Sequence, residues 1–331
     1  MEFGICFKGD IDVQRTIRLA QTAEEGGFDY VWTFDSHVLW KEAFNMLGVI
    51  AANTKRVKLG PLVTNPGPRS VDLAASIFAT LNIVSEGRMV CGMGRGDSSR
   101  RMMGKPPTTI KRMMQYSEDL KTLAEGGTVQ VDGVDVQLPW ANPDYKLPMW
   151  LAGYGPKVLR ACAPLADGIV LQIAEPSLIT WFIDQVKAGA EEVGRDPSEI
   201  QYMAAAPVFV SDDLDKCREQ CRWFPGMVGN HIADLIKNQS IGVPDNLLKA
   251  IEGRTGYDYK QHADKDSDHL DWVTSDVVDS FSVLGPAEMQ IEKLKALRDV
   301  GLNQFVIYLM CEEEEKIVET YVNEIIPALR K

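Results

Sequence analysis

Strand-like apolar runs alternate with segments of helical periodicity along the whole chain of 331 residues. This alternation is typical of repeated β-α units around a parallel sheet. Eight β-α units indicate a closed (β/α)8 TIM barrel, an α/β fold that gathers its functional groups around one mouth. The predicted strands are residues 3–7, 29–34, 57–63, 88–93, 148–152, 168–172, 201–209 and 303–309.

Helices between these strands carry their own start and stop signals. An apolar face through Ala20 and Ala23 is predicted to end at Gly26 and Gly27, and Ser70 is the predicted N-cap of a later helix. Such helices would cover the sheet from outside.

A barrel of this kind needs about 250 residues, so roughly 80 must lie in insertions. Residues 129–138 are predicted to form a small hairpin that turns at Asp132-Gly133. Residues 223–279 form a long polar insertion in the seventh β-α unit, and two interpretations stay open: a lid, or an irregular surface excursion. The chain is therefore predicted to be one domain, residues 1–331, with a candidate lid at 223–279.

Charge and composition limit the partners. A formal net charge of −12 argues against nucleic acid and anionic membranes as main partners. No apolar run approaches the roughly 20 residues that cross a bilayer, and the start lacks signal-peptide features, so a cytoplasmic location is predicted. The six cysteines lack the spacing of a metal or redox site, so they are expected to be reduced thiols and no metal site is predicted.

Reacting groups of a barrel come from the carboxyl ends of its strands. Residues 59–66 carry two prolines after a strand pattern, so a bulge or sharp exit can turn Thr64 and Asn65 inward. His37 follows the strand-end residue Asp35, an arrangement that can hold an imidazole for proton transfer. A buried structural histidine is the alternative interpretation of His37.

The loop after the fourth strand combines glycines with positive charge. Gly92, Gly94 and Gly96 let a ligand approach the backbone, but their spacing is not that of a dinucleotide-binding turn. Between residues 88 and 112, seven residues are basic and only Asp97 is acidic. Either this run is a solvated face, or some of its members neutralise a phosphate or carboxylate of a ligand. The candidates for that role are Arg95, Arg100, Arg101 and Lys105.

Gly153-Tyr154-Gly155-Pro156 opens a predicted helix directly after the fifth strand. Pro156 suits the first helical turn, and the free backbone N–H groups of that turn can hold a phosphate oxygen.

Blocks spread nearly from end to end resemble the bacterial-luciferase-like oxidoreductases, and within them the deazaflavin (F420) branch close to methylenetetrahydromethanopterin reductase. These blocks are Phe3-Gly4-Ile5, residues 23–32 with Asp35 and His37, residues 58–66, Gly92 to Asp97, Gly153 to Pro156, and residues 281–285. The resemblance implies a barrel that binds one flavin-type ring, F420 or FMN, at the carboxyl ends of the strands, in a homodimer.

The resemblance also assigns roles to single residues. Asp35 and His37 would lie beside the reactive ring and the substrate, although Ser36 separates them here. Leu62-Val63 would form a non-proline cis peptide that backs the ring. The other residues expected to bind the cofactor are Thr64, Asn65, Gly94, Arg95, Gly96, Asp97, Gly153, Tyr154, Gly155, Pro156 and Gln172.

Three functional hypotheses follow. The first is an F420-dependent oxidoreductase that transfers hydride to or from a small organic substrate, with His37 or Asp35 handling the proton. The second is an FMN-dependent two-component monooxygenase that uses oxygen and reduced flavin from a separate reductase. The third is a flavin-binding protein without catalytic activity. The basic loop favours the polyanionic deazaflavin.

Overall fold

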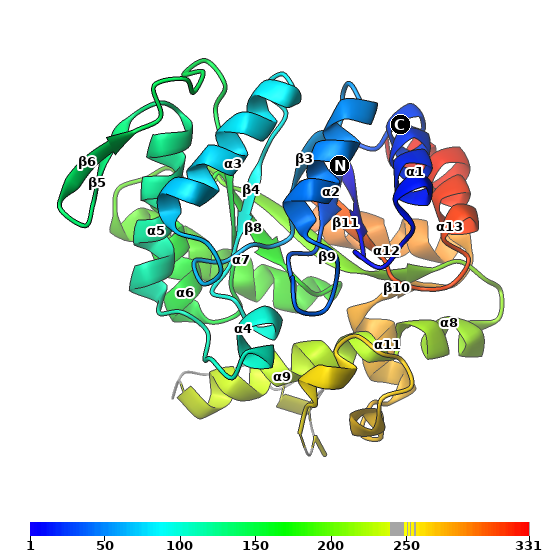
Figure 1. The fold of residues 1–331 in the computed structure, drawn as a ribbon. Coiled ribbons are helices and arrows are strands. Elements are labelled where there is room, and N and C mark those ends of the chain that lie inside the picture. The colour runs from blue at the N-terminus through cyan, green and yellow to red at the C-terminus, as the bar shows by residue number, and fades with distance from the viewer. Residues whose placement is uncertain (239–247, 250, 252, 255, 331) are drawn as a thin grey trace.

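The computed structural model describes residues 1–330 except 239–247, 250, 252 and 255. Within this part of the chain, eight parallel strands form a barrel in the order β3-β2-β1-β11-β9-β8-β7-β4 (Figure 1). Their bounds are β1 (Glu2–Phe7), β2 (Tyr30–Thr33), β3 (Lys58–Pro61), β4 (Cys91–Met93), β7 (Met149–Ala152), β8 (Gly168–Leu171), β9 (Gln201–Phe209) and β11 (Gln304–Leu309). Each predicted strand is confirmed, with ends that differ by up to three residues.

The barrel closes at a seam between β3 and β4. Isolated parallel bridges pair Leu59 with Met89 and Thr64 with Met93. Two glycines make this close approach possible, because a Cβ atom at Gly60 would lie 2.4 Å from the carbonyl oxygen of Val90. A Cβ atom at Gly92 would lie 2.1 Å from the carbonyl oxygen of Pro61.

Helices surround the strands and follow the predicted signals. α1 ends at Gly26, and Gly27 adopts a positive φ of 94°. Ser70 is the N-cap residue of α3, as predicted, although its hydroxyl makes no capping hydrogen bond. The helices are α1 (Val13–Glu25), α2 (Ala43–Asn53), α3 (Val71–Val84), α4 (Ser98–Met102), α5 (Ile110–Ala124), α6 (Pro156–Cys162), α7 (Pro176–Glu192), α8 (Leu214–Cys221), α9 (Trp223–Asn238), α11 (Ser275–Phe281), α12 (Ala287–Asp299), α13 (Glu314–Thr320) and α14 (Ile326–Arg330).

Short elements complete the chain. The predicted hairpin is confirmed as β5 (Thr128–Val131) and β6 (Val134–Gln137), with positive φ at Asp132 and Gly133. The remaining elements are β10 (Val283–Leu284), which pairs with β9, the 3-10 turns η1 (Pro197–Glu199), η2 (Tyr259–Gln261) and η3 (Asp268–Leu270), and the π-turn η4 (Tyr321–Ile325). None of the described helices is long and apolar enough to cross a membrane.

Aromatic side chains fill part of the barrel interior. Tyr30 and Trp32 stack with ring centroids 5.5 Å apart, and Trp150 meets both rings edge-on. Trp150 lies on β7, which is not a sheet neighbour of β2, so these contacts cross the interior. Tyr30 begins β2, so the aromatic residues occupy the end of the barrel opposite the strand carboxyl ends.

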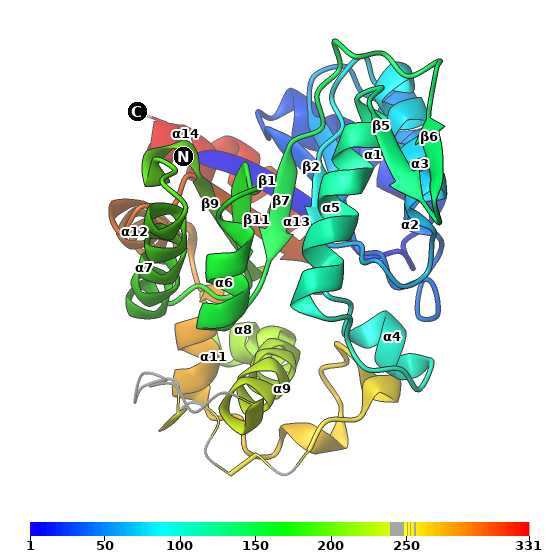
Figure 2. The ribbon, with the colours of Figure 1, turned by 90° about the vertical axis from the view of Figure 1, so that its left-hand side faces the viewer.

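The chain between β9 and β11 runs across the strand carboxyl ends. Figure 1 and Figure 2 both place α9 and α11 on that side of the barrel, where α4 also lies. Residues 239–247, 250, 252 and 255 of the candidate lid lie outside the described residues. For the rest of 223–279, the position over the strand ends agrees with a lid. Whether it moves stays a prediction.

Candidate active site

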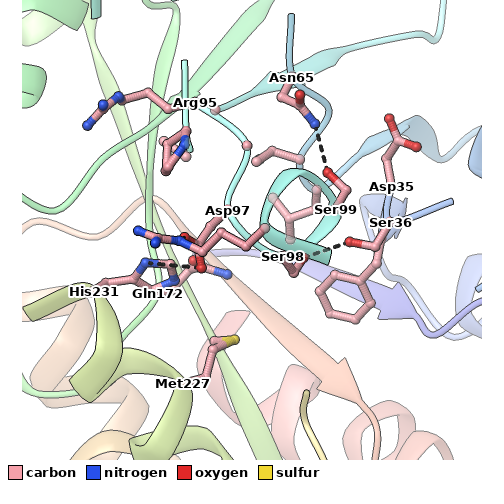
Figure 3. A pocket seen from close by; sticks show the side chains of 18 of the residues that line it. Asp35, Ser36, Asn65, Arg95, Asp97, Ser98, Ser99, Gln172, Met227 and His231 are labelled. Carbon is pink, nitrogen blue, oxygen red and sulfur yellow. Dashed lines mark hydrogen bonds and ion pairs between the residues drawn. The ribbon is translucent and has the colours of Figure 1, made fainter. Parts of the chain in front are cut away.

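A cavity of about 590 Å³ lies at the carboxyl ends of the strands, within the range of small-molecule sites. Figure 3 shows Asp35 and Ser36 on one side, and Met227 and His231 of α9 on the other. Most of the predicted site residues line this cavity. They are Asp35, Leu62, Val63, Asn65, Gly94, Arg95, Gly96, Asp97, Gly153, Tyr154, Gly155 and Gln172.

Three predicted site residues are not part of the lining. Thr64 is buried behind the wall, and Pro156 begins α6 just after Gly155. His37 is exposed, so neither proton transfer inside the cavity nor a buried structural role fits it. The reason is a turn that starts at Ser36, whose carbonyl accepts hydrogen bonds from the N–H groups of Leu39 and Trp40.

Asp35 is fully occupied by buried partners. Arg69 donates two hydrogen bonds to its carboxylate, at 2.7 and 3.2 Å, and the Thr64 hydroxyl donates one at 2.7 Å. Burial by itself would lower the pKa of Arg69, but Asp35 and Glu42 outweigh that effect and raise it. Arg69 and Thr64 occupy both oxygens of this carboxylate, so its geometry does not support the prediction that Asp35 handles the proton. Asp35 anchors the loop instead.

The loops after β3 and β4 pack closely at one wall of the cavity. The Leu62-Val63 peptide is cis, as the resemblance led us to expect. A Cβ atom at Gly94 would lie 2.8 Å from Cγ2 of Val63. At Gly96, φ is +76° and a Cβ atom would lie 2.6 Å from Cγ of Asn65. Glycine at these positions therefore lets the loop after β4 pack directly against Val63 and Asn65.

A chain of neutral polar groups crosses the cavity mouth. The Tyr154 hydroxyl donates to Oε1 of Gln172 at 2.7 Å, and Nε2 of Gln172 lies 2.5 Å from the Tyr308 hydroxyl. Burial raises the pKa of both tyrosines, for Tyr154 well above its usual value. Gln172 is thus fixed between two phenols that stay protonated.

Asp97 joins three parts of the chain. Its carboxylate accepts hydrogen bonds from Arg101 at 2.6 Å and from the Tyr259 hydroxyl at 2.7 Å, and Nδ1 of His231 lies 3.9 Å from Oδ2. Burial alone would raise the pKa of Asp97, but His231, Tyr259 and Arg101 outweigh it and lower that pKa. The imidazole of His231 also stacks on Tyr154, with centroids 4.6 Å apart.

The basic residues between 88 and 112 are of two kinds: some line the cavity, where they could contact a ligand, and others do not. Arg95 and Arg101 line the cavity, whereas Arg100 and Lys105 do not. Arg95 and Arg100 each donate one hydrogen bond to a backbone carbonyl, of Thr108 and Pro106 respectively. Among the described lining residues, Arg95 and Arg101 therefore carry the basic charge, and Arg101 is paired with Asp97. Among the described residues, no group of three His, Cys, Asp or Glu side chains could hold a metal ion.

A second cavity, of about 700 Å³, lies beside the first. The residues that line both cavities, and so lie between them, are Trp40, Trp223, His262, Ala263 and Met310. The Tyr257 hydroxyl lies 2.7 Å from Nδ1 of His262 and fixes that ring. Burial lowers the pKa of His262 to about 4.

Several lining residues escaped the sequence analysis. Met227 and His231 are four residues apart, a spacing that places both on one face of α9. This spacing would have identified the two residues as cavity lining only if the helix had already been known to face the cavity. Other residues that were not predicted include Ser36, Trp40, Ser98, Ser99, Trp223, His262, Tyr308 and Met310.

The chain is similar to known proteins along its whole length. A family model described as luciferase-like monooxygenase matches residues 1–304. The 5,10-methylenetetrahydromethanopterin reductase of Archaeoglobus fulgidus is 28% identical over the full length of both chains. An F420-dependent glucose-6-phosphate dehydrogenase of Nakamurella multipartita is 26% identical over 94% of this chain and 91% of the relative. The solved structure of the coenzyme F420 dependent tetrahydromethanopterin reductase from Methanopyrus kandleri superposes with a TM-score of 0.80, at 24% identity and 99% coverage of both chains.

Proposed function

The chain belongs to the luciferase-like monooxygenase family, and on that premise we propose that it is an oxidoreductase that binds coenzyme F420 and transfers hydride to or from a small organic substrate. The observation that carries this proposal is the cavity of about 590 Å³ at the carboxyl ends of the strands, with Gly94 and Gly96 in its lining. Glycines in the lining let a ligand approach the backbone closely, and similar proteins are named for F420.

The residues present fit this cofactor in two respects. The volume of the cavity, about 590 Å³, is within the range of small-molecule sites. Arg95 and Arg101 belong to its lining, with Arg101 paired to Asp97, and a cationic lining suits the polyanionic tail of F420 better than the single phosphate of FMN. We place the phosphate near Gly153, Tyr154 and Gly155, where α6 begins.

When bound, F420 supplies a two-electron hydride carrier. The chain's own residues would position and shield it. Asp35 and Arg69 hold the loops after β2 and β3 together, and Asn65 is fixed by a hydrogen bond from its Nδ2 to Ser99 at 3.2 Å. Gln172, held between two protonated tyrosines, offers an oriented amide to a polar group of the substrate. The two described elements α9 and η2 would help to keep water out of the cavity.

An FMN-dependent monooxygenase is the second candidate, because the family description itself names monooxygenases. It would draw reduced flavin from a separate reductase. A non-catalytic flavin-binding protein is the third candidate.

Separate titrations of the purified protein with F420 and with FMN distinguish these candidates, with cofactor binding measured by fluorescence. We expect tighter binding of F420, and slow reaction of the reduced complex with oxygen. Preferential FMN binding, with rapid oxygen consumption by the reduced complex, would select the monooxygenase. Binding without turnover of any alcohol or sugar phosphate donor would favour the third candidate, and binding of neither cofactor would reject all three.

A glycine substitution tests the binding wall. The methyl group of Gly94→Ala would press on Val63, and overpacking of this kind costs about 1–3 kcal/mol, so F420 should bind about tenfold more weakly. The matched control is Gly256→Ala, because a Cβ atom at Gly256 has no neighbour within 4 Å. Equal F420 affinity in both variants would contradict the placement of the ring.

We also propose that the protein is a homodimer. α3 exposes Leu73, Ile83 and Val84, each 45% exposed or more, which supports burial of this helix in an interface. Light scattering after size exclusion measures the oligomeric state.

A further inference from the structure

We propose that His231 is the proton-transfer residue of the cavity, an inference that rests on the proposed F420-dependent function. Its imidazole lines the cavity from α9, opposite the loop that carries Asp35 and Ser36 (Figure 3). Its side chain is 19% exposed, which leaves it open to the cavity but shielded from bulk solvent.

The geometry around His231 fixes the ring in one plane. The ring stacks on Tyr154 with an interplanar angle of 18°. Nδ1 faces Oδ2 of Asp97 at 3.9 Å, and Asp97 is itself held by Arg101 and Tyr259. An imidazole that faces a fixed carboxylate through one nitrogen presents the other nitrogen for proton exchange.

The other titratable groups of the cavity are less suited to this task. Arg69 and Thr64 occupy Asp35, while Arg101 and Tyr259 occupy Asp97. The two cavity tyrosines, Tyr154 and Tyr308, have pKa values raised by burial, so they do not release a proton near neutral pH.

The remaining histidines are also less suited. His37 is exposed and outside the lining. His262 lines the cavity, but burial lowers its pKa to about 4 and the Tyr257 hydroxyl occupies its Nδ1. A group that remains neutral at pH 7 cannot donate a proton in the reducing direction. His231 is the lining histidine with a carboxylate beside it.

The proposed step removes a hydride and a proton from the substrate. In the oxidising direction, a substrate H–C–X–H, where X is oxygen or nitrogen, loses hydride from carbon to the redox cofactor. The X–H proton passes to the free ring nitrogen of His231, so that a C=X bond replaces the broken C–H and X–H bonds. The imidazolium is paired with Asp97 until it releases the proton to solvent. Reduction of C=X is the same step in reverse.

NMR provides a test that does not depend on the substrate. The chain has four histidines, so histidine labelled with carbon-13 gives a simple spectrum in which single His→Gln variants assign each signal. Addition of F420 should shift the His231 signal and leave that of His37 in place. F420 binding, measured by fluorescence, with an unmoved His231 signal would overturn the inference while leaving the proposed function intact.

Kinetics test the proton-transfer role itself. A panel of secondary alcohols and sugar phosphates supplies a donor that reduces F420 with the natural protein. His231→Gln should then lower kcat by about 10²–10⁴ and change F420 affinity little. The matched control is His37→Gln, which should retain full activity.

The results distinguish a failure of the His231 assignment from a failure of the proposed function. A kcat of His231→Gln equal to that of the natural protein, or a large loss in His37→Gln instead, would overturn the assignment of His231. Thermal unfolding checks that both variants are folded. If His231→Gln does not fold, the NMR measurement on the natural protein still tests the inference. Failure of every donor to reduce F420 would contradict the proposed function, and the role of His231 with it.

Discussion

The charged residues of the site serve mainly to hold it together. Asp35 has a fully buried side chain, and Arg69 is only 10% exposed. Arg69 also bonds Glu42 at 2.6 Å, so one guanidinium joins the loop after β2 to the start of α2. Removing the cation would leave a buried carboxylate without its partner, which is far more costly than breaking an exposed ion pair.

Arg69→Met should therefore lower the free energy of unfolding by about 3–5 kcal/mol. Arg298→Met is the control, because the ion pair of Arg298 with Asp299 is exposed and should contribute about 0–1 kcal/mol. Urea denaturation measures both. The double variant Arg69→Met/Asp35→Asn should recover part of the loss, since it removes the buried charge. No recovery would contradict the explanation by an unpaired carboxylate.

At the scale of elements, the strands and the hairpin could be predicted from the periodicity of the sequence, whereas the conformation of the loops could not. Strands and the hairpin were predictable, because apolar runs and the Asp132-Gly133 turn depend on local chemistry. The cis peptide at Leu62-Val63 was expected from resemblance alone. The orientation of His37 was not predictable, because it depends on a turn set by two backbone hydrogen bonds to Ser36. The role of α9 was hidden for a different reason: its cavity face depends on tertiary packing over the mouth.

The described part of residues 223–279 is tied to the barrel through Asp97. The Tyr259 hydroxyl bonds its carboxylate at 2.7 Å, and the Arg101 guanidinium lies 5.6 Å from the Tyr259 ring centroid. A hydrogen bond to a charged group contributes about 1.5–3 kcal/mol, which is enough to affect local opening.

Tyr259→Phe should thus increase the rate of limited proteolysis between residues 223 and 279 several-fold. In the natural protein, F420 and substrate should slow the same cleavage, because ligands that the segment covers stabilise its closed position. Tyr145→Phe, far from this segment, is the control. Cleavage rates that respond to neither the substitution nor the ligands would mean that the segment is a passive loop.

For the whole molecule, acid is expected to weaken the fold through buried histidine. His262 has an ordinary pKa of 6.5, which burial lowers to about 4 in the folded state. Below pH 6.5 the unfolded chain binds a proton that the folded chain does not, so stability falls as pH decreases toward 4. Above pH 6.5 this group has no effect. Burial lowers the pKa of His269 too, so its effect has the same sign.

The natural protein should therefore lose about 2 kcal/mol more than His262→Gln between pH 7.5 and 5. A carboxylate with a lowered pKa such as Glu24 also destabilises the fold in acid, but it acts mainly at lower pH and equally in both proteins. Urea denaturation at pH 7.5, 6.5, 5.5 and 5 measures the difference. Parallel pH profiles of the two proteins would show that His262 takes up its proton normally when folded.

The seam between β3 and β4 has a consequence for how such a protein can diversify. At Gly60 and Gly92 even a methyl group would collide with a backbone carbonyl across the seam, so neither position accepts another amino acid without a shift of the strands. The opposite side of the ligand slot consists of side chains on a helix, where replacements leave the strand framework untouched. Proteins that descend from one ancestral gene would therefore keep the same β3–β4 side of the barrel and change their chemistry through substitutions along α9.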